Sequence, residues 1–537
     1  MDAVLLGGNI LTMDRSKRRV QALAVRGGKI AAVGPTGEIA RLATPKTKVV
    51  NLNGRTVTPG FMDPHNHFSM TTWEPVSVDC RVPPLRNKKA VLDAIAAAAA
   101  AAPTGKWIWG QAYSFQVFEE AGVLTKGELD EAGGDHPVCI MDFSYHALYA
   151  NSAALKLAGI TKNTPDPRGG VIVRDASGQP NGFLQERAMD LVHKTTMRAF
   201  IDLYGEDAVA DLVYQNSMRH LEHGVTSLGD AQTMPESGEM YRIADKRGKL
   251  PICVRQLRGG DTFFGAPERA SRGEFGKDTV SDRLRGGTMK IFMDPVFPNF
   301  GLYRCHPDGK MTPEGEVYYT QDEVDQLVLN ASKNGLQVAI HCIGNRAIEQ
   351  GLNALERSVR EVKGSDKLRH RIDHFSFPTN KQIQRIAKSP FIISQQPAFI
   401  YNIGHMFEQT LKDYNIDAPA AALASMVDAG ATIAAGSDFP CASIAPLDGI
   451  AASAGRRHIS GRQIAPEQAI SAEESIRQYT NGSAYVLFRE NEVGSLEVGK
   501  QADMVVLSHD PTAVHPDHIR GVVVEQTYVN GDLKFKK

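Results

Sequence analysis

Eight short apolar segments, spread over residues 57–437, constrain the fold of this chain more than any other feature. They have the length of strands and alternate with helix-like segments, a pattern typical of parallel α/β proteins. Eight such units predict a (β/α)8 TIM barrel, whose catalytic groups lie at the C-terminal ends of the strands. The segments are Val57–Met62, Val225–Asp230, Ile252–Leu257, Met289–Met293, Gln337–Ile343, Arg371–Phe375, Ile392–Gln396 and Thr432–Ser437.

Two regions depart from a simple barrel. Both ends of the chain are rich in short strand-like runs, with hairpin turns predicted at Asn53-Gly54 and Asn530-Gly531. We expect residues 1–58 and 488–537 to form one small β-sandwich domain beside a barrel domain over residues 59–487. About 160 residues separate the first two barrel segments, so we also expect an inserted lid or specificity subdomain at about residues 70–215.

The composition is that of an ordinary globular protein. The 537 residues are 42% hydrophobic and 23% charged, with a formal net charge of -1. This balance offers no basic patch for nucleic acid and no single-sign field for a membrane surface. The six cysteines are scattered without a C-x-x-C pair, and the N-terminus lacks the basic region of a signal peptide. We expect a cytoplasmic protein that acts on a small molecule; a homodimer would suit the fold.

Residue types that bind metals stand at the ends of several predicted strands. Taken singly, each has an ordinary explanation as a core histidine, a surface lysine or a helix-capping aspartate. Together they would all lie at one end of the barrel, and the first two are spaced so that both imidazoles can reach one ion from an extended strand. They are His65 and His67 after the first segment, Lys290 in the fourth, His341 and His374 at the ends of the fifth and sixth, and Asp438 after the eighth.

These positions resemble the metal ligands of the amidohydrolase superfamily, and the resemblance covers nearly the whole chain. Within that superfamily the chain looks most like the YtcJ-like branch, which contains N-substituted formamide deformylase. The matching stretches are Trp107–Gly110, His146-Ala147 with Asn151–Leu155, Gly182–Glu186, His341–Ala347 and the return into the β domain at Val493–Val505.

The resemblance implies a binuclear metal centre. His65 and His67 would hold the more buried ion, and His341 and His374 the second. Lys290 would bridge the two ions as a carbamate formed with CO2, and Asp438 would bind the first ion. Imidazole and carboxylate ligands suit two zinc ions, although manganese, iron or cobalt also fit. Such a pair can share a hydroxide that attacks a carbonyl, with Asp438 as general base and then general acid.

The residues that would contact the substrate are less defined. Where this branch commonly has Gly-Asp-Arg-Ala, the chain has Gly344-Asn345-Arg346-Ala347, which weakens any inference about the substrate. The resemblance implies that His146 faces the active site, and aromatic residues are candidates for the lining of an apolar pocket. The candidate substrate contacts are His146, Glu186, Trp73, Tyr113, Asn345 and Tyr303, with Phe143 and Tyr145 as further pocket candidates.

The leading interpretation is a metal-dependent hydrolase of a C–N bond in an amide or N-acyl amine. Esterase, lactonase or decarboxylase activity would use the same hydroxide. A mononuclear deaminase is a further alternative, but its usual glutamate is missing from Cys342–Asn345. A binding protein that kept the fold without catalysis is the third, although known examples have lost metal ligands that this chain retains.

Overall fold

In the part of the chain that the structure describes, eight parallel strands form the central sheet. The computed structural model describes residues 1–16, 19–81, 85, 87–113, 123–265, 267–275, 279–296, 299–306, 308–419 and 421–537. The strands pair in the order β8 (Phe61–Asn66), β15 (Val225–Thr233), β16 (Cys253–Arg258), β17 (Leu284–Phe292), β20 (Gln337–Cys342), β21 (Arg371–His374), β22 (Ile392–Gln395) and β23 (Thr432–Ala435).

The first and last strands of this sheet meet through residues of the candidate site. The Ser437 N–H donates to Asp63 Oδ1 at 2.9 Å, and the Asp438 N–H donates to the His65 carbonyl at 2.8 Å. Gly436 permits this approach, because a Cβ atom there would lie 2.7 Å from Asp63 Oδ1. The sheet is thereby nearly closed on itself, which confirms the predicted TIM-barrel fold class.

Amphipathic helices cover the outside of the barrel. Thr320 caps α9 (Gln321–Lys333) in a capping box with Glu323, which satisfies backbone N–H groups at the start of the helix. In α10 (Asn345–Glu361) the buried side recurs at helical spacing, as expected for a helix that packs on a sheet. The further covering helices include α6 (Asp190–Glu222), α7 (Pro235–Lys246), α11 (Asn380–Ala387), α13 (Leu423–Asp428) and α14 (Pro446–Gly455).

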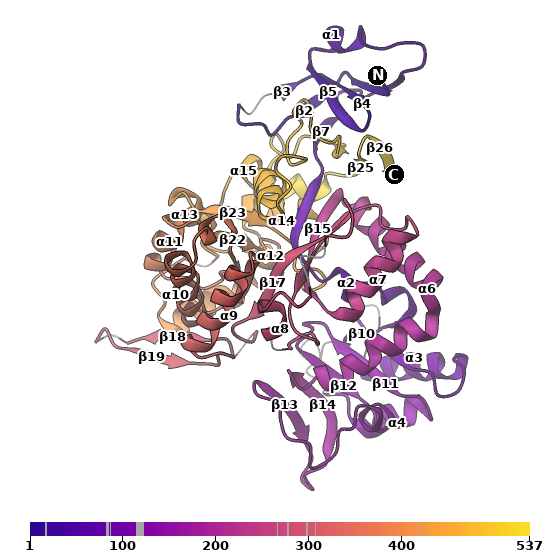
Figure 1. Cartoon of the computed structure of the whole chain (residues 1–537), viewed down its shortest axis with the longest axis vertical. Helices are drawn as coiled ribbons and strands as arrows, with labels where there is room; N and C mark the ends of the chain where they lie inside the picture. The colour runs from indigo at the N-terminus through magenta and orange to yellow at the C-terminus, as the bar shows by residue number, and fades with distance from the viewer. Residues whose placement is uncertain are drawn as a thin grey trace.

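The two ends of the chain build a β domain beside the barrel, in indigo and yellow at the top of Figure 1. Buried side chains from both of its sheets share one core, among them Leu5, Val25, Val57 and Val506. One sheet has the order β26 (Asp532–Lys536), β25 (Val524–Val529), β24 (Met504–Leu507), β7 (Thr56–Pro59), β2 (Asn9–Leu11) and β3 (Arg19–Val20). The other has the order β5 (Lys29–Gly34), β4 (Ala22–Arg26), β1 (Ala3–Leu6) and β6 (Lys48–Asn51).

The predicted first barrel strand, Val57–Met62, is wrong in its bounds. β7 ends at Pro59 and pairs with β24 in the end domain, whereas β8 starts at Phe61 and pairs with β15 in the barrel. Gly60 lies between them, and a Cβ atom there would lie 2.5 Å from Thr226 Oγ1. Only glycine lets the backbone pass so close to the neighbouring strand as it leaves one sheet for the other.

A mixed sheet at the lower end of Figure 1 forms the inserted subdomain. It is built between β8 and β15 and carries the helices α3 (Lys88–Ala101), α4 (Lys126–Gly133) and α5 (Ser152–Leu157). The strand order of its sheet is β13 (Gly170–Arg174), β14 (Pro180–Glu186), β12 (Ala147–Ala150), β11 (Val138–Asp142), β10 (Ile108–Tyr113) and β9 (Val78–Asp79).

No helix in the described part of the chain is long and apolar enough to cross a membrane.

Candidate metal centre

His65, His67 and Asp438 form a buried cluster at the C-terminal end of the barrel strands. Asp438 Oδ1 lies 3.3 Å from His65 Nε2 and 3.0 Å from His67 Nε2, and the three side chains are 1%, 6% and 9% exposed. One ligand atom from each residue lies within 4.8 Å of the others. Two imidazole nitrogens and one carboxylate oxygen that converge in this way are a donor set for a divalent metal ion.

The two histidines converge although they do not share an extended strand. β8 ends at Asn66, and His67 immediately precedes the short helix α2 (Phe68–Thr71), with a ψ of 53°. Their rings are nearly perpendicular, with centroids 5.7 Å apart. Asp438 has a φ of 56°, which is uncommon outside glycine and common at functional sites.

The hydrogen bonding of this cluster fits a metal ion. Asp438 Oδ1 is buried and has no hydrogen-bond partner of suitable geometry among the described residues, which is costly for a carboxylate oxygen unless a cation binds it. Burial raises the pKa of Asp438, but the histidines around it, His65 first, hold that pKa well below its usual range. Burial lowers the pKa of His67. The carboxylate is thus ionised and the imidazole neutral, the forms that bind metals.

Asp373 is the centre of an adjoining buried network that sequence analysis missed. Its Oδ2 lies 2.9 Å from Lys290 Nζ and 2.9 Å from His65 Nδ1, and its Oδ1 lies 2.7 Å from Arg371 Nε. Burial raises the pKa of Asp373, but Arg371 and Lys290 hold it well below its usual range. The carboxylate therefore lies beside Nδ1 of His65 on one side of the ring, and Asp438 lies beside Nε2 on the other.

Lys290 lies in β17 with its amine fully buried, and its Nζ donates to Asp373 Oδ2 at 2.9 Å. Burial lowers the pKa of this amine despite the nearby carboxylate. The predicted position of Lys290 at the site is thus compatible with the structure, whereas the bridging carbamate stays a prediction.

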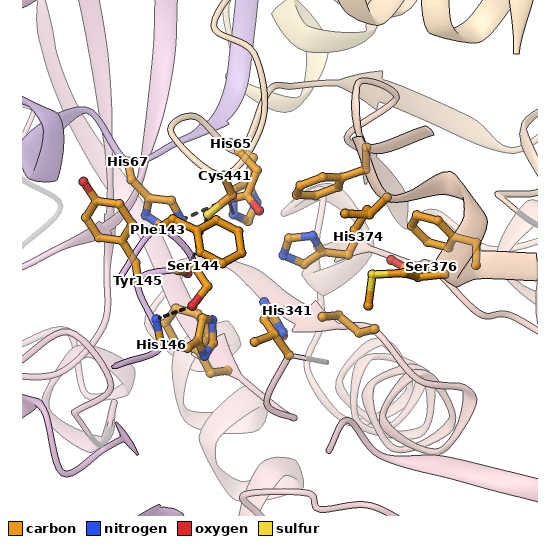
Figure 2. Close-up of a pocket in the computed structure, with 18 of the residues that line it drawn as sticks. His65, His67, Phe143, Ser144, Tyr145, His146, His341, His374, Ser376 and Cys441 are labelled. Atoms are coloured by element: carbon orange, nitrogen blue, oxygen red, sulfur yellow. Dashed lines mark hydrogen bonds and ion pairs between the residues drawn. The ribbon is translucent and has the colours of Figure 1, made fainter. Parts of the chain in front are cut away.

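His341 and His374 lie beside the cluster, as Figure 2 shows for both rings. Their ring centroids are 4.3 Å apart, and that of His374 is 4.8 Å from His65. Burial lowers the pKa of His374 to about 3 and that of His341 well below its ordinary value. Two neutral imidazoles therefore lie side by side next to the cluster of His65, His67 and Asp438.

A cavity of about 170 Å³ opens over these histidines (Figure 2). Its lining comes from the insert, from the C-terminal ends of the barrel strands and the loops after them, and from the helix α12 (Phe399–Tyr414). The lining is mainly apolar, and Phe143 and Tyr145 contribute to it as expected. The other aromatic residues of the lining were not among the candidates predicted from the sequence; they include Phe263, Phe292, Phe399 and Phe407.

The candidate substrate contacts fall into two groups. His146 lines the cavity, with its ring centroid 6.4 Å from that of His341, and Glu186 lies next to it. Glu186 and the other four candidates lie outside the lining of this cavity as far as the structure describes it. Trp73 and Tyr113 pack against other aromatic side chains, and Asn345 Oδ1 accepts a hydrogen bond from the backbone N–H of Tyr303 at 2.6 Å.

The chain is similar to known proteins in sequence and in fold. The model of the Amidohydrolase family matches residues 48–534. The chain is 36% identical over its full length to N-substituted formamide deformylase of Arthrobacter pascens, of which it covers 98%, and 30% identical to YtcJ of Bacillus subtilis (strain 168), with both chains covered in full. An uncharacterised metal-dependent hydrolase from Pyrococcus horikoshii OT3 matches the fold with a TM-score of 0.75 at 22% identity, covering 96% of this chain and 99% of that one. The chain therefore belongs to the amidohydrolase family.

Proposed function

We propose that this protein hydrolyses the C–N bond of an N-acyl amine with an apolar substituent, a substituted formamide being the simplest case. The observation that carries the proposal is the convergence of His65, His67 and Asp438 at the wall of an apolar cavity. The similarity to a protein named N-substituted formamide deformylase supports the choice of bond. The aromatic lining supports an apolar substituent, because burial of apolar surface is the main source of affinity in such a cavity.

The proposed centre holds two divalent metal ions, most naturally zinc. His65, His67 and Asp438 would hold one ion, His341 and His374 the other, and a carbamate on Lys290 would join them. When bound, the ions would polarise the scissile carbonyl and supply a hydroxide at neutral pH. Asp438 lines the cavity, which supports the role that we assign to its carboxylate: it would take the proton of the attacking water and pass it to the leaving nitrogen.

Metal removal tests the proposal directly. We expect protein stripped with a chelator to lose hydrolysis of N-butylformamide, measured as formate and butylamine released. Zinc should restore the activity at about two ions per chain. About one ion per chain would favour the mononuclear alternative, and no bound metal would favour a binding protein. A larger rate enhancement over the uncatalysed reaction for butyl formate than for the amide would favour an esterase.

The Asp438→Asn variant tests the proton transfer. We expect turnover to fall by about 10²- to 10⁴-fold, while most of the metal stays bound because the histidine ligands remain. The matched control is Asp428→Asn, which changes an exposed aspartate at the end of α13 and should leave turnover unchanged. Turnover near that of the wild type in Asp438→Asn, with metal retained, would rule out the role of Asp438 in proton transfer.

A further inference from the structure

A chain of hydrogen bonds joins His146, in the insert, to the barrel side of the cavity. His146 Nδ1 lies 2.7 Å from Glu186 Oε2, and the same oxygen accepts a hydrogen bond from the Tyr318 hydroxyl at 2.7 Å. The side chains of His146 and Glu186 are 10% and 20% exposed, and Tyr318 is 2% exposed. The Glu186 carboxylate is thus held by two side chains from different parts of the fold.

The backbone around Glu186 is also fixed. Glu186 ends β14 with a φ of 51°, a left-handed conformation that is unfavourable for a residue other than glycine. Its N–H donates to the His146 carbonyl at 2.8 Å, and the Tyr318 N–H donates to the carbonyl of Met293, just after β17, at 2.7 Å. The surrounding structure therefore places this carboxylate against one nitrogen of His146.

The contacts decide which nitrogen of His146 carries a proton. Burial and the neighbouring Glu186 hold the pKa of Tyr318 well above its ordinary value, so its hydroxyl is a donor. The carboxylate oxygen that takes the Tyr318 proton is an acceptor, so the His146 Nδ1–H donates to it as well, and in the neutral ring Nδ1 carries the only proton. His146 Nε2 is then a hydrogen-bond acceptor, and no residue in the described part of the chain occupies it.

The position of the His146 ring in the cavity lining indicates what Nε2 could bind. His146 lines the cavity near His341, as Figure 2 shows, and its ring packs against Phe264 with centroids 4.9 Å apart. A lone pair held beside the metal ligands suits a substrate that presents an N–H. A secondary amide presents one next to its carbonyl, whereas a tertiary amide or an ester does not.

We infer that Glu186 and Tyr318 are positioning residues that hold His146 in its neutral Nδ1–H form, so that Nε2 accepts a hydrogen bond from the N–H of the scissile amide. This inference rests on the proposed function and narrows its substrates to secondary amides. A partly buried acceptor left without its donor typically costs about 1–3 kcal/mol. We therefore expect kcat/KM to favour the secondary amide by about 10- to 100-fold.

The first test compares N-butylformamide with N-butyl-N-methylformamide. In the wild type, kcat/KM for the secondary amide should exceed that for the tertiary amide. In Glu186→Gln the ratio of the two values should be close to one, because the amide of glutamine can donate to Nδ1 and move the ring proton to Nε2. Hydrolysis of the tertiary amide should change little, which separates the effect from a general loss of structure. Glu131→Gln, an exposed change on α4, should leave the ratio unchanged. Tyr318→Phe should lower the ratio less than Glu186→Gln, and it serves as the test if Glu186→Gln does not fold.

The second test does not depend on activity. In protein with ¹⁵N-labelled histidine, the His146 ring, assigned by its loss in His146→Gln, should show a proton on Nδ1 alone, and Tyr318→Phe or Glu186→Gln should change this signal. A doubly protonated ring or an Nε2–H form in the wild type would overturn the inference. An unchanged substrate ratio in a variant that hydrolyses amides would also overturn it, while the proposed function would stand. A wild type that hydrolyses neither amide would overturn the proposed function and the substrate assignment, and the ring signal would still decide the positioning role.

Discussion

Among the residues of the candidate site, Asp373 contacts several buried nitrogen atoms. It contacts Lys290, Arg371 and His65, and all four side chains are at most 1% exposed. Its carboxylate compensates the buried guanidinium of Arg371, which stays charged whether Lys290 is an amine or a carbamate. Removing one partner of a buried ion pair is strongly destabilising, because the other charge stays buried without compensation.

We therefore expect Asp373→Ala to lower the free energy of unfolding by about 3–5 kcal/mol, measured by urea denaturation. Asp366→Ala is the matched control. Asp366 is exposed in a short 3-10 helix just before β21, the strand that carries Asp373. This change should alter the free energy of unfolding by less than about 0.5 kcal/mol. A stability of Asp373→Ala equal to that of the control would show that this carboxylate does not compensate the buried charge of Arg371.

The same residues show how far the sequence can predict the site. The candidates His65, His67 and Asp438 could be named because metal-binding residue types recur at the ends of predicted barrel strands. Asp373 could have been found from its spacing to Arg371, since residues two apart on a strand share a face. Phe263 could not, because it lies in a loop after β16 whose path follows no periodicity.

The helix α12 forms one wall of the cavity, and a turn at residues 458–462 packs against it. Phe399 and Phe407 line the cavity, while His405, on the same helix, has its Nδ1 3.0 Å from His458 Nε2. Other contacts between helix and turn are the Ile459 N–H with the Tyr401 carbonyl, the Glu408–Arg462 ion pair and, from a neighbouring segment, Arg520 over the Tyr401 ring.

This contact predicts that the docking of α12 depends on pH. Burial, and then the neighbouring His458, lower the pKa of His405 below its ordinary 6.5. A histidine whose pKa is lower in the docked state binds fewer protons there, so docking is stable above about pH 6.5 and weakens as the pH falls below it. Arg462 adds to the repulsion of a second charge, and Glu408 opposes it.

We expect amide hydrogen exchange in α12, corrected for the intrinsic effect of pH, to be faster at about pH 5 than at about pH 7.5. In His458→Ala the exchange should be fast at both values. His509→Ala, at another exposed histidine, is the control and should behave like the wild type. Equal protection of α12 at both pH values in the wild type would contradict the prediction.

The strands were easier to predict than this helix wall. Each of the eight apolar segments overlaps a barrel strand, because a strand buried on both faces needs apolar residues whatever its neighbours are. The break at Gly60 was not predictable, since it depends on β7 pairing with β24, more than 440 residues away. The role of α12 likewise depends on where the helix packs.

At the scale of the whole molecule, the end domain packs on the strand that carries His65. Val505 in β24 is fully buried and shares a core with Phe61, the first residue of β8. The Gly224 backbone passes so close that a Cβ atom there would lie 2.9 Å from a Val505 methyl carbon. This contact joins the end domain to the base of the barrel.

We expect Val505→Asp to lower the free energy of unfolding by at least about 3 kcal/mol, from lost apolar burial and an unpaired buried carboxylate. The metal content should fall with it, because β8 loses its support. Thermal unfolding and elemental analysis of the purified protein measure the two effects. Val498→Asp, at a position 63% exposed, should change neither. Normal metal content in a destabilised Val505→Asp protein would show that metal binding does not depend on the packing of the end domain against β8.

The pairing of β7 with β24 also has a consequence for biosynthesis. β7 is complete once residue 59 has been translated, but its antiparallel partner spans Met504–Leu507. At roughly 5–20 residues per second, the ribosome needs on the order of half a minute to a minute and a half to reach that partner. Throughout this time one edge of β7 is open to other chains and to chaperones. The strand that leads into the metal centre is thus made long before the partner strand that covers its open edge.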